Sequence, residues 1–201
     1  MIDLALVSYV GVMSVTPGPN NLLLAASGVH FGLRRTWPHA VGVSFGHFVQ
    51  VFVVTLAFGS LVGFFQGVRP WLAGVGATYL LWLSWKIFRA GVPEDKQGRK
   101  PMSFLGGALF QAVNPKAWVM VINTALLFTP QGINPFLGAA GLAAVCAAVN
   151  LPCVALWAVT GDRLRRFLAR GGAALVFNSS MGLLMAGTAL WLLVEELDRV
   201  L

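Results

Sequence analysis

Two short polar tracts interrupt long apolar stretches of the sequence, and they hold the residue types best suited to binding a small polar molecule. The first tract consists of Thr16, Pro17, Gly18, Pro19, Asn20 and Asn21, and the second of Asn114, Pro115 and Lys116. Proline removes an amide donor and glycine weakens a helix, so each tract leaves backbone carbonyls without helical partners. The asparagine side chains add both hydrogen-bond donors and acceptors.

A zwitterionic amino acid would fit such a place well. A half-helix that starts after the first tract would direct its free N–H groups at a carboxylate. The exposed carbonyls would hold an ammonium group. The alternative is that Pro17, Pro19 and Pro115 only kink helices for packing, as isolated prolines in membrane helices often do. Two asparagine and proline breaks at matching positions favour the binding site over kinks alone.

The composition indicates that a lipid bilayer surrounds these tracts. Of the 201 residues, 57% are apolar and only 10% are charged, and the mean hydropathy is +0.77. Soluble domains carry about 25% charged residues, so this chain has too little polar material to cover a water-facing surface. We expect a single membrane domain over residues 1–201, because no linker-like stretch divides the chain.

Six apolar segments are each long enough to cross a bilayer, for which a helix needs ~20 residues. They lie near residues 4–27, 38–66, 70–90, 104–128, 134–160 and 174–196. The predicted fold is therefore an all-α, polytopic membrane protein with six transmembrane helices.

The basic residues predict how these helices are oriented. Three connecting loops and their flanks hold 11 of the 14 lysines and arginines, whereas the other side holds only Arg69 and Arg199. The 11 are Arg34, Arg35, Lys86, Arg89, Lys96, Arg99, Lys100, Arg163, Arg165, Arg166 and Arg170. Lysine and arginine in short loops stay cytoplasmic, so both termini are expected outside the cell.

Three helices per half would insert the two halves, about residues 1–90 and 104–201, in opposite directions. Such inverted repeats are common in secondary transporters, whose sites form where helices are interrupted at corresponding places. The two tracts begin about 13 and about ten residues into the first and fourth predicted helices. At 1.5 Å per residue both breaks lie ~15 to 20 Å deep, near the bilayer midplane.

Lys116 is the sharpest functional candidate. A charge at the centre of a membrane costs about 2.5 to 3.5 kcal/mol on insertion scales, and such a residue is by default a functional-site hypothesis. If the fourth helix started later than expected, the Lys116 side chain would instead extend to the cytoplasmic interface.

Two further ionisable residues are candidates for proton coupling. His47 lies about nine residues into the second predicted helix, and the unperturbed pKa of histidine, ~6.5, suits a proton carrier. A histidine that is hydrogen-bonded within the bundle is the alternative. Asp162, at the end of the fifth helix, either gates the protein or forms an interfacial ion pair. Asn150 and Pro152 either face the same cavity as the two tracts or mark a local kink.

Small residues recur at the spacing that permits close helix contact. The pairs are Gly42 with Gly46 and Gly59 with Gly63. They serve either packing within the bundle or the formation of a homodimer, and the sequence does not choose between them.

Four tracts form a recognisable set: T-P-G-P-N-N at 16–21, G-V-S-F-G-H at 42–47, Y-L-L-W-L-S-W-K at 79–86 and N-P-K-A-W at 114–118. Together they resemble the LysE/RhtB family of bacterial amino-acid exporters, and the likeness covers essentially the whole chain. The resemblance implies secondary active export of amino acids or close derivatives across the bacterial cytoplasmic (inner) membrane, driven by the proton gradient. It also carries over the motif positions Thr16 to Asn20 and Asn114 to Lys116.

One departure from the family pattern bears on the substrate. In relatives that handle basic amino acids we would expect an acidic residue in the second helix. This helix contains His47 and no Asp or Glu. The resemblance therefore favours a neutral substrate.

Two other functions compete with transport. An intramembrane enzyme would need a nucleophile with its base, a carboxylate pair or metal-ligand spacing, and the apolar segments contain none of these. A passive channel or a non-transporting subunit would also tolerate midplane breaks, and dependence on protons would separate it from a transporter. Nucleotide-binding motifs are absent, no cofactor or metal is expected, and the scattered basic residues form no nucleic-acid-binding face. The expected partners are a small amino acid, protons and the lipid bilayer.

Overall fold

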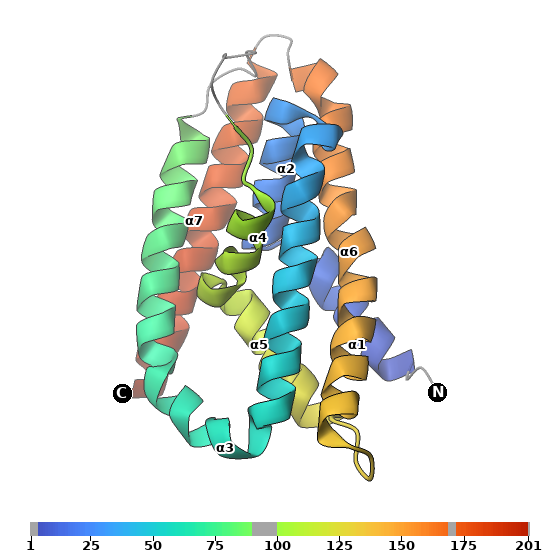
Figure 1. Cartoon of the computed structure of the whole chain (residues 1–201). Helices are drawn as coiled ribbons and strands as arrows, with labels where there is room; N and C mark the ends of the chain where they lie inside the picture. Colours follow the sequence, from blue (N-terminus) through green and yellow to red (C-terminus); the bar gives the residue numbers. More distant parts are fainter. Residues whose placement is uncertain (1–3, 90–99, 169–171, 201) are drawn as a thin grey trace.

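The fold is a bundle of helices in which long elements flank short ones. A computed structural model describes residues 4–89, 100–168 and 172–200, and within these ranges every regular element is a helix. The helices α3, α6 and α7 run along the length of the molecule, with the shorter helices packed between and beside them (Figure 1). The elements are α1 Leu4–Val15, α2 Pro19–Phe31, α3 Leu33–Phe88, α4 Phe104–Phe110, the 3-10 turn η1 Gln111–Val113, α5 Pro115–Phe128, α6 Pro135–Leu168 and α7 Ala173–Val200.

Both predicted breaks are present, and each lies at the tract that the sequence marked. α1 ends at Val15, and α2 begins at Pro19 after Gly18, whose backbone is extended (φ −175°, ψ 174°). The second break has a 3-10 turn followed by Asn114, also extended (φ −90°, ψ 105°), and α5 begins at Pro115. Proline occupies the first position of both new helices, where its missing amide hydrogen costs no helical bond.

The predicted loop between the first two segments is wrong. Only Gly32 separates α2 from α3, and Arg34 and Arg35 belong to the first turn of α3. Gly32 has φ +77°, in the left-handed region that glycine adopts without strain. Its amide donates to the Gly28 carbonyl, and Gly32 is both the C-cap of α2 and the N-cap of α3.

The two predicted segments 38–66 and 70–90 belong to one element, α3. Figure 1 shows α3 descending, turning at the lower end of the molecule and returning, so that it forms two antiparallel arms. Only three residues separate the predicted segments, and the chain reverses there without leaving helical backbone. The remaining segments agree with the observed helices to within a few residues, except that α6 extends to Leu168.

Helices approach closely where glycines face a neighbouring backbone. A Cβ at Gly28 would overlap the Ala158 carbonyl of α6, and one at Gly161 would overlap the Ala25 carbonyl of α2. On the other side of the bundle, Gly42 and Gly46 of α3 face the backbone of α4 in the same way. This pair therefore serves packing within the bundle; the surroundings of Gly59 and Gly63 lie outside what the structure describes.

The outer surface is apolar, as expected for a protein in a bilayer. Leu109, Leu127, Leu137 and Leu183 are each more than 60% exposed. Among the described residues, two helices are long and apolar enough to cross a membrane, Leu33–Ala57 and Pro135–Arg165. Parts of the broken elements form shorter apolar helices, at Leu4–Val15, Phe104–Val113 and Pro115–Phe128. Apolar surface this extensive is unusual in a monomeric soluble protein.

Gly161→Ala should destabilise the fold because its methyl group meets backbone, which cannot move aside without separating α6 from α2. We expect the free energy of unfolding to fall by about 1 to 3 kcal/mol. The measurement is thermal unfolding of the detergent-solubilised protein. Gly141→Ala is the matched control, since Gly141 lies on the same helix with no atom within 4 Å of the added methyl group. Equal melting temperatures for the two variants would contradict close packing at Gly161.

Candidate functional site

The two breaks meet, and the side chain of Lys116 joins them. Lys116 is the second residue of α5, and its Nζ donates hydrogen bonds to three oxygens of the first break. The acceptors are the Thr16 carbonyl at 2.7 Å, the Thr16 hydroxyl at 2.8 Å and the Pro17 carbonyl at 3.1 Å. Residues 100 positions apart in the sequence are thereby held together, and Lys116 does not extend away from the bundle.

A second contact mirrors the first. Asn20 is the second residue of α2, as Lys116 is of α5, and its Nδ2 donates to Oε1 of Gln111 at 3.3 Å. Gln111 precedes the second break, just as Thr16 begins the first. The second residue of each new helix therefore donates a hydrogen bond to a residue at or just before the other break.

Other side chains satisfy the carbonyls at the end of α1. Asn21 Nδ2 donates to the carbonyls of Ser14 (2.8 Å) and Thr16 (2.7 Å). Trp157 of α6 donates from Nε1 to the Val15 carbonyl at 3.0 Å. Backbone groups released by a helix break in a membrane must find partners inside the protein, and these bonds supply them.

Gly18 provides the space through which Lys116 reaches the first break. A Cβ at this position would lie 2.7 Å from Cδ of Lys116. The extended backbone of Gly18 is open to any residue, so the glycine is required for its size and not for its backbone angles.

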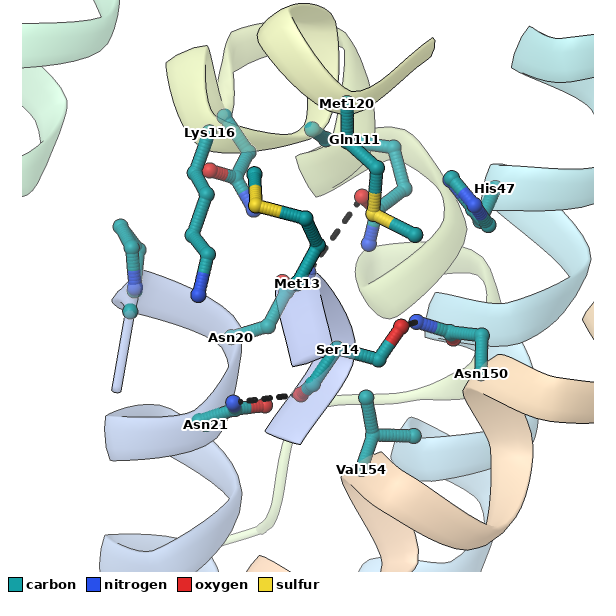
Figure 2. A pocket seen from close by; sticks show the side chains of 14 residues that line it. Met13, Ser14, Asn20, Asn21, His47, Gln111, Lys116, Met120, Asn150 and Val154 are labelled. Atoms are coloured by element: carbon teal, nitrogen blue, oxygen red, sulfur yellow. Dashed lines mark hydrogen bonds between the residues drawn. The ribbon is translucent and has the colours of Figure 1, made fainter. Parts of the chain in front are cut away.

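A chain of buried polar side chains crosses the bundle beside the breaks. Ser44 of α3 donates to Oδ1 of Asn150 at 2.8 Å, and Nδ2 of Asn150 donates to the Ser14 hydroxyl at 2.9 Å. Figure 2 shows Asn150 reaching from α6 to Ser14 at the end of α1. The chain fixes α1 against α3 and α6 directly before the first break.

The breaks and this polar chain surround a small cavity of about 30 Å³. A cavity needs roughly 10 to 15 Å³ to hold a water molecule, so it accommodates water but not an amino acid. Its lining is mixed, with amide groups and His47 beside the apolar side chains of Met13 and Met120 (Figure 2). None of the 14 lining residues is acidic.

Several buried polar atoms of the cavity lining have no hydrogen-bond partner. They are Oδ1 of Asn20, Oδ1 of Asn114, Nε2 of Gln111 and Nε2 of His47. A buried polar group without a partner costs about 1 to 3 kcal/mol. Two acceptors, one donor and an imidazole nitrogen at one cavity are the groups that a small polar ligand or water would satisfy.

The structure brings together most of the residues that the sequence selected. Gly18, Pro19, Asn20, Asn21, Asn114 and Lys116 line the cavity, as does His47. Thr16 and Pro17 contribute the oxygens that hold Lys116, and Pro115 starts α5. Asn150 lines the cavity, which is one of the two alternatives that the sequence offered for it. Asp162 does not line the cavity and lies beside Gly32.

Sequence reasoning missed two polar and four apolar residues of the lining: Ser14, Gln111, Met13, Ala117, Met120 and Val154. Gln111 lies one turn before Asn114, and Ser14 lies two residues before the first tract. Because both polar residues lie so close to a predicted break, the sequence could have indicated that they line the site. The sequence offers no such indication for the methionines, since apolar residues are common throughout membrane helices.

The chain has recognisable relatives. The family model of the LysE type translocator matches residues 11–196. Cysteine/O-acetylserine efflux proteins of Escherichia coli (strain K12), Escherichia coli O1:K1 / APEC and Shigella flexneri serotype 5b (strain 8401) are each 29% identical to this chain over 171 residues. The match covers 84% of this chain and 86% of each relative. No solved structure matches the chain.

Gly18→Ala should weaken the junction between the breaks, because the added methyl group displaces the Lys116 side chain from its three acceptors. We expect the free energy of unfolding to fall by about 1 to 3 kcal/mol, measured by thermal unfolding in detergent. In a Lys116→Ala background the same change should cost much less, since the clash is gone. Gly11→Ala is the control, because its methyl group would lie 3.9 Å from Val149. Additive effects of the Gly18 and Lys116 changes would contradict this contact.

Proposed function

Because the chain belongs to the LysE type translocator family, we propose that it exports amino acids or their close derivatives, neutral ones in preference, by secondary active transport. Membership of this family makes it a transporter and not an enzyme. The observation that carries the proposal is the meeting of two helix breaks, joined by Lys116, around one small polar cavity. The efflux of cysteine and O-acetylserine in the names of its relatives is consistent with a small substrate.

The helix ends at the cavity suit a zwitterion. The first helical bond of α2 runs from Leu22 to Gly18 and that of α5 from Trp118 to Asn114, so the amides before them have no partner within their helix. Two positive helix ends therefore begin beside the cavity, where a carboxylate is favoured. The end of α1 brings carbonyl oxygens to the same place, and these favour an ammonium group.

Charge and size support a neutral, small substrate. The cavity lining carries Lys116 and no carboxylate among the described residues. A second cation, such as the side chain of lysine or arginine, would find no carboxylate to neutralise its charge in this lining. The apolar side chains of Met13, Met120 and Val154 in the lining favour a substrate with a short apolar or weakly polar side chain.

We extend the proposal to the arrangement in the membrane. Six crossings would be formed by α1 with α2, the two arms of α3, α4 with α5, α6 and α7. The halves 1–90 and 104–201 would be inverted repeats, each with a broken first helix. The reciprocal contacts of Asn20 with Gln111 and of Lys116 with Thr16 support this symmetry. The basic loops would face the cytoplasm of a bacterial cell, with both termini outside.

His47 is the better of the two candidates for proton coupling. Its ring lines the cavity, is only 2% exposed, and has Nε2 without a partner. Asp162 does not line the cavity. A proton on His47 and a substrate in the cavity would therefore be close enough to affect each other's binding.

Purified protein in liposomes loaded with labelled amino acids should release at least one of them faster when the outside is made more acidic than the inside. The panel contains serine, cysteine, O-acetylserine and lysine, and efflux of label is measured against protein-free liposomes. His47→Gln should retain downhill release but lose the acceleration by the pH gradient. Absence of release across the panel would reject amino-acid export, and release indifferent to the gradient would favour a passive channel.

Lys116→Ala and Asn114→Ala should each abolish concentrative export while the protein still inserts and is recovered from the membrane. The first variant removes the link between the breaks, and the second removes a cavity acceptor. The matched controls are Lys100→Ala, at an exposed position, and Asn123→Ala, on α5 but not in the cavity lining. Normal export by both site variants would show that the cavity is not the substrate site.

A further inference from the structure

Resting on the proposed function for the identity of the substrate, we propose that the oxygens now bound to Lys116 form the subsite for the substrate's ammonium group. Lys116 occupies this subsite as a tethered competitor when no substrate is bound. The subsite, here called the oxygen cage, consists of the Thr16 carbonyl, the Thr16 hydroxyl and the Pro17 carbonyl.

The geometry of the oxygen cage matches a primary ammonium group. An ammonium on a carbon chain has three N–H donors, and Nζ of Lys116 meets three oxygens between 2.7 and 3.1 Å. The oxygens lie just beyond the carboxyl end of α1, where the helix dipole favours a cation. The α-ammonium of an amino acid presents the same three donors as the lysine side chain does.

Nothing in the cage is specific for lysine. Its oxygens are neutral, and none of the described residues that line the adjoining cavity is acidic. Lys116 is thus held by hydrogen bonds and dipoles without an acidic partner in that lining. Another ammonium group can replace it without leaving a buried carboxylate unpaired.

The space allows one occupant at a time. The cavity of about 30 Å³ cannot admit an amino acid while the Lys116 side chain passes Gly18 into the cage. Two acceptors without partners, Oδ1 of Asn20 and Oδ1 of Asn114, lie in the same lining. They offer hydrogen bonds to the Lys116 ammonium once it has left the cage.

Exchange between the two ammonium groups has a clear consequence for transport. Substrate binding would separate Lys116 from the first break, and the return of Lys116 would expel the substrate. A variant without this side chain should hold ammonium ligands more tightly and release them more slowly. Loss of export in Lys116→Ala would then accompany a gain of binding, the opposite of what loss of a carboxylate-binding lysine would give.

The test uses methylammonium as a probe for the cage in detergent-solubilised Lys116→Ala protein. Methylammonium chloride should raise the melting temperature of this variant by roughly 2 to 4 °C at a few times its dissociation constant. The wild-type protein and Lys100→Ala, whose cages are filled, should not respond. Tetramethylammonium chloride, which has no N–H donor, should stabilise none of them. Lys116→Ser is measured in parallel, so that poor folding of one variant does not decide the result.

The outcomes separate this inference from the proposed function. Equal stabilisation of wild type and variants by methylammonium, or stabilisation of none, would overturn the cage. If methylammonium stabilises the Lys116 variants but wild-type liposomes release no amino acid, the ammonium subsite is supported and the proposal of amino-acid export is rejected. If wild-type liposomes export amino acids but the variants ignore methylammonium, export stands and Lys116 is not a competitor.

Discussion

A broken helix in a membrane must have its freed backbone groups satisfied inside the protein, and this requirement organises the centre of the molecule. The end of α1 exposes carbonyls that hydrocarbon cannot solvate. Three side chains donate hydrogen bonds to these carbonyls: Asn21 of α2, Trp157 of α6 and Lys116 of α5. The three helices are therefore assembled around the first break. The side chains that donate hydrogen bonds to these carbonyls also make the centre of the bundle polar.

The use of an ammonium for part of this repair makes the first break different from the second. Lys116 and Asn20 occupy equivalent positions at the starts of α5 and α2, but only one carries charge. The contact of the Asn20 amide with Gln111 is one hydrogen bond at 3.3 Å, whereas the partly buried ammonium of Lys116 needs several acceptors together. The first break therefore presents three oxygens to the Lys116 ammonium, and the second break supplies that charged donor.

Sequence reasoning located both breaks because their causes are local. Pro17, Pro19 and Pro115 each lack a backbone donor and stand beside Gly18 or Asn114, which together disfavour a continuing helix, whereas the single Pro152 lies inside α6. Lys116 was selected because a charge inside a membrane is costly, but its bonds to Thr16 and Pro17 were not predicted. The continuity of α3 and the single-residue joint at Gly32 were not predicted, since hydropathy reports which residues avoid water and not where helical backbone stops. Ser14, Gln111 and Met120 entered the site through tertiary packing, which no short window of sequence contains.

The joint between α2 and α3 at Gly32 differs from the connection between α1 and α2. With a single residue between them, α2 and α3 have almost no connecting backbone that could change their separation. α1 is different, because non-helical backbone from Thr16 to Gly18 connects it to α2. The side chains of Asn21, Trp157 and Lys116 donate hydrogen bonds to the carbonyls at its end. The position of this 12-residue helix therefore depends on those bonds and on the packing of Leu6 and Val10 against α3, α5 and α6, and not on continuous helical backbone.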